Sequence, residues 1–533
     1  MTVDNVALLP AYLAAGTAVL VLLADLLVAR RGATVAVGAL GAVATAVGAV
    51  LVGRGGARET FCVDDACSYL ATGRSALVAT VFALLTLGVL GLSAPLLRAG
   101  RVPAGEYCFL LACSMTGGVV LGAAGDLITL IVALETLTLP LYVLVGLRRE
   151  RVASAEAAVT FFVVSVVATA VTLLGAALLY AVTGRLHLRE LGAVFAAGGG
   201  PIGQVAGGGP IGQVAGSGTA GQVAGSGALD LPLTTVAVTL LLLGLAFKVA
   251  AVPFHAWAPG SYDGAPLPVA GYLSTASKLG GVIALLTVTA IALPATVVGP
   301  VLAGLAVLTM TVGNLVALRQ DRTVRLLAWS SIAQAGYILA PLGALSVAAG
   351  RTGSGFATAL AATVAYTVFF VVLEFAAFGA LVLLRPPGAD GGRIDDLRGA
   401  ARRHPWVGAA FVLALVGLAG LPPGLAGLFA KVTVVRSLLD GGSGWLAVVV
   451  ALNAVVGLVY YLRVAATLYA PADRELAPGD AAPVGASRSG DPVGPVPVRG
   501  RPAWPVVAAL AAAILVAVVI GFAPQLILDV ARL

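Results

Sequence analysis

The chain has 533 residues, of which 60% are hydrophobic and only 10% are charged, and its mean hydropathy is +1.04. This composition excludes an ordinary soluble domain. The net charge of +7 comes from arginines that cluster in loops, so it indicates membrane topology and gives no evidence for nucleic-acid binding. Apolar runs of about 18 residues or more recur along the chain and predict helices, because barrel strands would alternate every second residue. We therefore predict an all-α polytopic membrane protein.

About fourteen transmembrane helices are predicted in chain order. The first is long and ends at Arg30-Arg31, which favours a retained span over a cleaved signal. The first three helices form an N-terminal unit, 1–105, and the last helix lies in a C-terminal segment, 503–533. The predicted helices cover residues 6–29, 34–53, 76–97, 106–124, 127–147, 157–183, 231–252, 268–293, 296–317, 324–347, 356–384, 406–438, 444–469 and 503–525.

The arginines between these helices predict the orientation of the chain. Most of them, including Arg148 and Arg322, fall on the same side as Arg30-Arg31, and few fall on the opposite side. Because short loops rich in Lys and Arg stay in the cytoplasm, both termini are predicted to lie outside.

Two cysteines lie in the predicted external loop after the second helix. Cys62 and Cys67 are separated by four residues, and an oxidising compartment would allow a disulfide between them. A zinc site is the alternative, but it would lack two of the four usual ligands. Cys62 and Cys67 are therefore a candidate disulfide.

Two long segments are predicted to be loops. The external segment 184–230 contains a glycine-rich unit that repeats at Gln204, Gln213 and Gln222, without acidic ligands for calcium and with few large apolar residues. We predict that it is flexible. The segment 470–502 is rich in proline, glycine and charge, and is predicted to be a cytoplasmic linker before the last helix.

All three lysines lie inside predicted transmembrane helices, at Lys248, Lys278 and Lys431. A cation at the centre of a bilayer costs roughly 2.5–3.5 kcal/mol on insertion scales, so intramembrane lysines indicate a function. Arginine cannot release its proton at workable pH, whereas a buried lysine can exchange one. The lysines are therefore candidates for a proton path.

One intramembrane carboxylate, Glu135, lies at a depth similar to that of Lys248. Two groups that stabilise each other's charge, at a separation that changes, form a proton switch. The alternative is a static ion pair that fixes helix packing. Lys278 and Lys431 have no equally obvious carboxylate, and Glu374 is a further intramembrane acid and a candidate relay residue.

Two of the predicted helices contain breaks next to lysines. Pro253 follows Lys248, and Pro422-Pro423 precedes Lys431. Interrupted helices in corresponding halves of a chain mark transport sites, although a simple proline kink is the alternative. His255 lies just after the first break and is a second candidate relay residue, because histidine exchanges protons near neutral pH.

Several stretches resemble the antiporter-like, proton-translocating membrane subunits of respiratory complex I, a family shared with multisubunit sodium/proton antiporters. The resemblance covers roughly residues 60–470. It implies two inverted five-helix repeats with two broken helices, here in 106–293 and 294–469, flanked by extra helices. The stretches that carry it are ALETLTLPLYVL (133–144), AFKVAAVPFHAWAPGSYDGAPLPVAGYLSTASK (246–278), GNLVALRQDRTVRLLAWSSIAQAGY (313–337), RIDDLRGAARRHPW (393–406), LAGLPPGLAGLFAK (418–431) and NAVVGLVYYLRV (453–464).

The resemblance also implies roles for four charged residues. Glu135 corresponds to the family's fifth-helix glutamate and Lys248 to its partner in the broken seventh helix. Lys278 corresponds to the central lysine of the eighth helix, and Lys431 to the terminal charge of the broken twelfth.

The sequence departs from the family pattern at several accessory positions. Gln334 replaces a frequent histidine, and a relay through this amide would need water, because an amide carries no proton. Gly260 and Ser261 replace an acid and an apolar residue, and Thr160 and Val324 replace frequent lysines.

As a function, the resemblance implies proton translocation from the cytoplasm to the outside in a bacterial plasma membrane. Lys431 and the end of the chain after the fourteenth helix favour the N-type branch. The chain has no motif for a phosphate, haem or iron–sulfur cluster. Flavin, iron–sulfur clusters and quinone are thus expected in partner subunits, the other membrane and peripheral subunits of complex I. The alternatives are a sodium/proton antiporter subunit and a structural scaffold.

Overall fold

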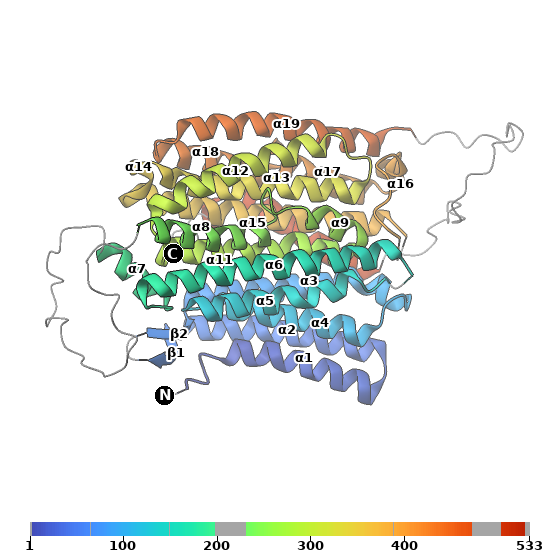
Figure 1. Cartoon of the computed structure of the whole chain (residues 1–533). Coiled ribbons are helices and arrows are strands. Elements are labelled where there is room, and N and C mark those ends of the chain that lie inside the picture. The colour runs from blue at the N-terminus through green and yellow to red at the C-terminus, as the bar shows by residue number, and fades with distance from the viewer. Residues whose placement is uncertain are drawn as a thin grey trace, which may run out of the picture.

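The computed structural model describes residues 3–63, 66–148, 150–197, 231–386, 389–471 and 503–527. Helices lie side by side along one direction and account for nearly all of the regular structure (Figure 1). Twelve helices in these ranges are long and apolar enough to cross a membrane, which confirms the predicted polytopic helical class. The predicted inverted relation between two five-helix repeats stays a prediction.

The long helices follow the predicted order. One of them is composite, because a π-helical turn, η1 (Leu273–Ser277), joins α10 (Leu267–Tyr272) to α11 (Lys278–Ile291). The others are α1 (Leu9–Val28), α2 (Arg31–Arg54), α3 (Gly73–Arg98), α4 (Ala104–Leu121), α5 (Leu127–Val145), α6 (Val152–Thr183), α12 (Ala295–Ala317), α13 (Thr323–Gly343), α15 (Gly353–Leu384), α19 (Gly444–Tyr469) and α20 (Trp504–Phe522).

Two of the fourteen predicted helices are not continuous. In the segment predicted at 231–252, α8 (Leu231–Lys248) ends before the predicted boundary, and an irregular stretch leads on to α9 (Trp257–Gly264), beyond that segment. The segment predicted at 406–438 consists of α17 (Pro405–Ala419) and α18 (Leu425–Asp440), separated by Gly-Leu-Pro-Pro-Gly. Proline removes a backbone donor and disfavours helix at the preceding residue, so both breaks lie near the prolines that the sequence predicts to cause them. The helices end a few residues earlier, at Lys248 and Ala419.

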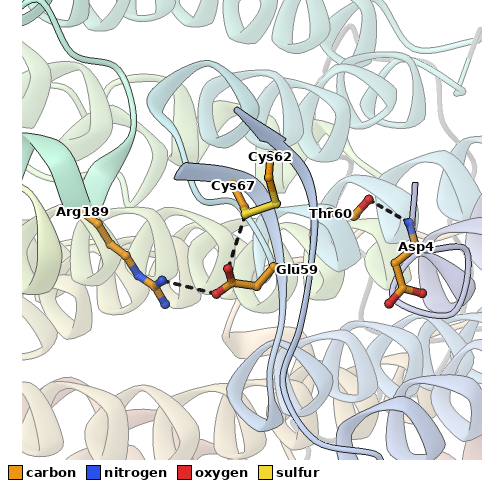
Figure 2. Close-up of a disulfide and its surroundings, with 6 residues drawn as sticks. All are labelled: Asp4, Glu59, Thr60, Cys62, Cys67 and Arg189. Carbon is orange, nitrogen blue, oxygen red and sulfur yellow. Dashed lines mark hydrogen bonds and ion pairs between the residues drawn. A yellow bond between two sulfur atoms is a disulfide. The ribbon is translucent and has the colours of Figure 1, made fainter. Parts of the chain in front are cut away.

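A β-hairpin interrupts the otherwise helical chain and was not predicted. Strands β1 (Arg58–Val63) and β2 (Ala66–Ala71) pair antiparallel, with Cys62 opposite Cys67, and the structure joins these two cysteines by a disulfide (Figure 2). The short polar loop between two long apolar helices gave no strong alternation in its sequence. The hairpin is held at the end of the bundle, where the backbone N–H of Leu70 donates to Ala123 O at 2.7 Å.

The predicted loop 184–230 begins with a helix, which corrects that prediction over its first part. Helix α7 (Leu188–Ala197) buries Leu188 and Leu191 against the bundle. The guanidinium group of Arg189, on α7, lies 3.3 Å from Glu59 Oε1 on the hairpin, so α7 also contacts the disulfide loop (Figure 2). The glycine-rich repeat at 198–230 and the predicted linker at 472–502 lie outside the described residues.

The remaining short helices connect the long ones. They are α14 (Ala348–Arg351), α16 (Ala400–Arg403), and the single turns η2 (Ala344–Ser346) and η3 (Asp395–Leu397). Helix α6 packs along α8, α12 along α13, and α15 against α13, α17 and α18. Most intramembrane charges described below lie on these central helices.

Candidate functional site

The first element of the site is an ion pair between α5 and the end of α8. Glu135 Oε1 lies 2.7 Å from Lys248 Nζ. The lysine side chain is 3% exposed and the glutamate 20% exposed, so the pair is largely removed from solvent. The pairing that depth and family resemblance predicted is therefore present in the structure.

Three acceptors surround the Lys248 ammonium group. Besides Glu135, Nζ donates to Thr138 Oγ1 at 3.0 Å and to Ser165 Oγ at 3.2 Å. An ammonium group has three donors, so all three have a partner. On the other side of the pair, Thr169 donates to Glu135 Oε1 at 2.6 Å. These hydroxyl groups stabilise the charged form of both residues at membrane depth.

The break after α8 places Lys248 at the end of a half-helix. Ala250 adopts a positive φ of 57°, which ends the helix, and the N–H of Ala251 returns to Ala246 O at 3.0 Å. The next free N–H, on Val252, donates to Thr309 Oγ1 of α12 at 3.0 Å. These backbone N–H groups of the irregular stretch are thus bonded to protein groups, as membrane depth requires.

Lys278 follows η1 and is the next buried cation. Its side chain is 1% exposed, and Nζ donates to the backbone oxygen of Ser331 on α13. Helix α11 also approaches Lys248 closely, because a Cβ added at Gly281 would lie 3.0 Å from the Lys248 backbone carbon. Gly281 is one turn from Lys278, so the surroundings of the two lysines are contiguous.

Gln334 connects the partners of Lys278 and Lys431. It lies one turn after Ser331 on α13, and its Nε2 donates to Leu418 O at 3.0 Å. The adjacent carbonyl oxygen, of Ala419, accepts from Lys431 Nζ at 2.5 Å. The hydrogen bonds of Lys278 and Lys431 therefore reach residues that are neighbours along α13 and at the end of α17, but they do not form one unbroken chain.

Two tyrosines complete the environment of Gln334. Tyr366 donates to Gln334 Oε1 at 2.6 Å, and Gln334 Nε2 also donates to the Tyr461 hydroxyl at 3.0 Å. Because the amide cannot carry a proton, these contacts orient Gln334, and proton transfer at this point requires a hydroxyl group or water.

Gly420 shapes the break in which Lys431 is held. Its φ is +81°, in the region that favours glycine, and an added Cβ would lie 2.6 Å from Lys431 Cδ. The lysine is 8% exposed, and its Nζ lies 5.1 Å from the centre of the Tyr337 ring. Lys431 is thus held by a backbone carbonyl and an aromatic face.

The two remaining candidate relay residues, Glu374 and His255, have different surroundings. Glu374 on α15 is fully buried, as expected for an intramembrane acid. His255 is only partly buried, and its ring packs 5.1 Å from that of Trp329. None of the described contacts of His255 involves Glu135 or the three lysines, so the structure does not bring it into the series.

A cluster of charged residues lies beyond the ends of the long helices. Arg322 binds Asp263 with two hydrogen bonds, of 2.8 and 3.0 Å, and Asp390 with one of 3.1 Å. Burial raises the pKa of Asp390, but hydrogen bonds from Arg322 and Arg151 outweigh it, and the pKa lies below its ordinary value. Asp263 thus supplies a carboxylate near Gly260, where the family pattern has its acid.

The hydroxyl groups around Lys248 were missed at the sequence level. Thr138 lies one turn after Glu135 on the same face of α5, a spacing that would have identified it. Ser165 and Thr169 lie on α6, and nothing in their local sequence distinguishes them from hydroxyls that bond their own helix.

A cavity of about 2000 Å³ elsewhere in the bundle is not connected with these charges. It is lined mainly by apolar side chains of α3, α11, α15 and α20, and by none of the four residues Glu135, Lys248, Lys278 and Lys431. The side chains of Lys248, Lys278 and Lys431 are buried, so these charges are packed inside the protein.

Comparisons with known proteins agree with this geometry. A family model described as "NADH:quinone oxidoreductase/Mrp antiporter, TM" matches residues 124–457. A protein of Salinispora tropica named NADH-quinone oxidoreductase subunit N is 69% identical, and the alignment covers 99% of each chain. Subunit N 2 from Streptomyces griseus is 42% identical, over 88% of this chain and 83% of the relative.

Solved structures show the same architecture. A chain of respiratory complex I from Thermus thermophilus has a TM-score of 0.73 and 28% identity, over 98% of both chains. A chain of the Mrp complex from Dietzia has a TM-score of 0.74 over 99% of this chain and 96% of the other. Its identity is 23%, so this second similarity concerns the fold alone.

Proposed function

The chain belongs to the NADH:quinone oxidoreductase/Mrp antiporter family of membrane proteins, and we propose that it is the N-type, proton-translocating membrane subunit of an NADH:quinone oxidoreductase. The observation that carries the proposal is the 2.7 Å contact between Glu135 and Lys248, followed by two further buried lysines whose hydrogen bonds reach neighbouring residues along α13 and at the end of α17. Two relatives, at 69% and 42% identity, bear the subunit N name.

The Glu135–Lys248 pair acts as the switch. When the pair is closed, the carboxylate and two hydroxyls favour the protonated lysine. When the two groups separate, Lys248 loses its counter-charge and passes its proton toward Lys278. Glu135 tunes the affinity and Lys248 carries the proton; loss of pumping in Glu135→Gln but not in Lys248→Met would reverse these roles.

Proton movement is driven from other subunits. The series contains charges and hydroxyls but no redox group among the described residues, so a partner must supply the energy. We assign flavin, iron–sulfur clusters and quinone to partner subunits of complex I, and the chain itself to the bacterial plasma membrane. We infer cytoplasm-to-outside transport from the family, and the loop arginines support an orientation with both termini outside.

A secondary sodium/proton antiporter subunit is the second candidate. The family description includes Mrp antiporters, and the Dietzia Mrp chain shares the fold. The subunit names of the two relatives favour the redox-driven reading. Purification from the native membrane separates the two: co-purification with flavin and iron–sulfur proteins supports complex I, and their absence supports the antiporter.

The test of the proposal is Lys248→Met in the native host. NADH oxidation and NADH-driven acidification are measured together in inverted membrane vesicles, after assembly of the complex has been checked. We expect both to fall, because the substitution removes the exchangeable proton. Arg436→Met removes an 82% exposed cation and serves as the control. Wild-type levels of both activities in Lys248→Met would refute the proposal.

A further inference from the structure

Glu374 is a fully buried carboxylate that the proposed switch does not use. It lies on α15 with 0% exposure, and neither of its oxygens has a hydrogen-bond partner within the described part of the chain. A carboxylate in an apolar interior is costly in its charged form unless another charge or water compensates it. Its surroundings must therefore contain such a group.

Lys278 is a buried cation on an element that packs against α15. Its Nζ lies 5.7 Å from the centre of the Phe370 ring, and Phe370 is one helical turn before Glu374 on the same face of α15. Both η1 and α11, which flank Lys278, pack against α15. The two charged groups interact electrostatically.

Lys278 has hydrogen-bond donors without a described partner, and Glu374 has acceptors without one. The one described hydrogen bond of the Lys278 ammonium goes to Ser331 O, which leaves two donors, and Glu374 has two unused oxygens. The hydroxyls of Tyr262 and Ser331 are likewise buried without a well-formed hydrogen bond. A site with several unsatisfied polar groups suits water.

The other titratable groups near Glu374 are tyrosines. Tyr262 on α9 and Tyr461 on α19 interact with it electrostatically. Both are ordinarily neutral near pH 7. Lys431 lies on α18, which also packs against α15, but among the described residues Lys278 is the cation that interacts electrostatically with the Glu374 carboxylate.

We propose that Glu374 is the counter-charge of Lys278, and that the proton passing this position resides on the Glu374 carboxylate. With charged Lys278 and charged Glu374 the site is neutral, so the lysine stays protonated at rest. An arriving proton converts the carboxylate to a carboxylic acid, and its departure restores the ion pair. A lysine alone would have to become a neutral amine in each cycle. This inference rests on the proposed proton-translocating function.

The first test compares Glu374→Gln with Glu374→Asp in the assembled complex. We expect Glu374→Gln to lower NADH-driven proton pumping by about tenfold or more, as loss of a proton-transferring group does. The alkaline limb of its pH–rate profile should move to lower pH, because protonated Lys278 has lost its counter-charge. Glu374→Asp, which keeps the charge, should retain part of the activity. Glu106→Gln, at an exposed helix start, is the matched control.

Lys278→Met separates this inference from the proposed function. Normal pumping in Lys278→Met would refute the relay itself. Loss of pumping in Lys278→Met with normal pumping and an unchanged pH profile in Glu374→Gln would refute only the role of Glu374.

The second test measures the interaction without relying on activity. Each single substitution leaves a buried charge unpaired, whereas Lys278→Met combined with Glu374→Gln removes both charges. We expect the double variant to accumulate to a higher level, and to resist heat better, than either single variant. If the double variant is no more stable than the less stable single variant, the two charges do not form a pair and the inference is wrong.

Discussion

Both broken helices hold a buried lysine close to the break, but the two lysines have different partners. Lys248 lies in the last turn of α8, and Lys431 on α18 donates to Ala419, the last residue of α17. The Lys431 ammonium group therefore lies at the C-terminal end of half-helix α17, where carbonyls and the helix dipole favour a cation. The Lys248 ammonium group instead bonds side chains of α5 and α6. A carboxylate is present only at Lys248, where Glu135 lies 2.7 Å away.

Because of this difference, we expect Lys248 and Lys431, at the two ends of the series, to behave differently. A carboxylate that moves away changes the electrostatic energy of Lys248, so the first site is switchable. Backbone carbonyls move only with their helix, so the electrostatic potential at Lys431 is fixed by the backbone geometry between α17 and α18. We infer that the first half sets the timing of proton transfer and that the second half depends on backbone geometry. The following substitutions test this contrast.

The largest effect is expected for Gly420→Ala. A non-glycine residue at φ +81° costs about 1–2 kcal/mol, and its Cβ would lie 2.6 Å from Lys431 Cδ. The lysine must leave its carbonyl partner, so most proton pumping should be lost while NADH oxidation in detergent is less affected. Pumping and oxidation are measured in vesicles and in the purified complex.

The corresponding position in the first break is the control. Ala250→Gly gains about 1 kcal/mol from relief of its positive φ and loses roughly as much from one buried methyl group. Its thermal stability and pumping should stay close to wild type. Equal losses in the two variants would show that both breaks depend on backbone geometry alike, against the contrast drawn above.

A smaller effect is expected for Thr138→Val. Valine keeps the shape but leaves one N–H of the Lys248 ammonium unpaired, which costs about 1–3 kcal/mol. The complex should lose thermal stability and pump several times more slowly. Thr136→Val, on the same helix, removes a hydroxyl that bonds only its own helix, and it should behave as wild type. Identical behaviour of the two variants would mean that Thr138 does not support the ammonium group.

The smallest effect is expected at the charged cluster outside the long helices. Asp390→Asn should lower stability by about 1 kcal/mol, a value near the surface range because Arg322 is 38% exposed. The folded-state pKa of Asp390 lies below its ordinary 3.8, so its contribution is present above that pH and is lost only as the pH falls through the lowered value. The difference from wild type, measured by thermal unfolding, should therefore stay constant between pH 5 and 8. A difference that vanishes by pH 5 would contradict this pKa direction.

The sequence predicted the parts of the site that depend on depth and on backbone chemistry. Glu135 and Lys248 were each predicted near the middle of an apolar helix, and Pro253 and Pro422 indicated which two helices are interrupted. The partner of Lys278 could not be predicted, because Glu374 lies on a helix far along the chain and its approach depends on how α15 packs. Helix α7 was overlooked because the adjacent glycine repeat dominated the composition of 184–230.

Replacement of Lys248 by arginine tests the central claim most directly. Arginine keeps the positive charge and binds a carboxylate at least as well as lysine, but it does not release its proton. Proton pumping is measured in inverted vesicles that contain the assembled Lys248→Arg complex, with NADH as the substrate. The switch account predicts that pumping is lost although the ion pair with Glu135 is kept. Pumping at the wild-type level would show that the pair is a static support for helix packing.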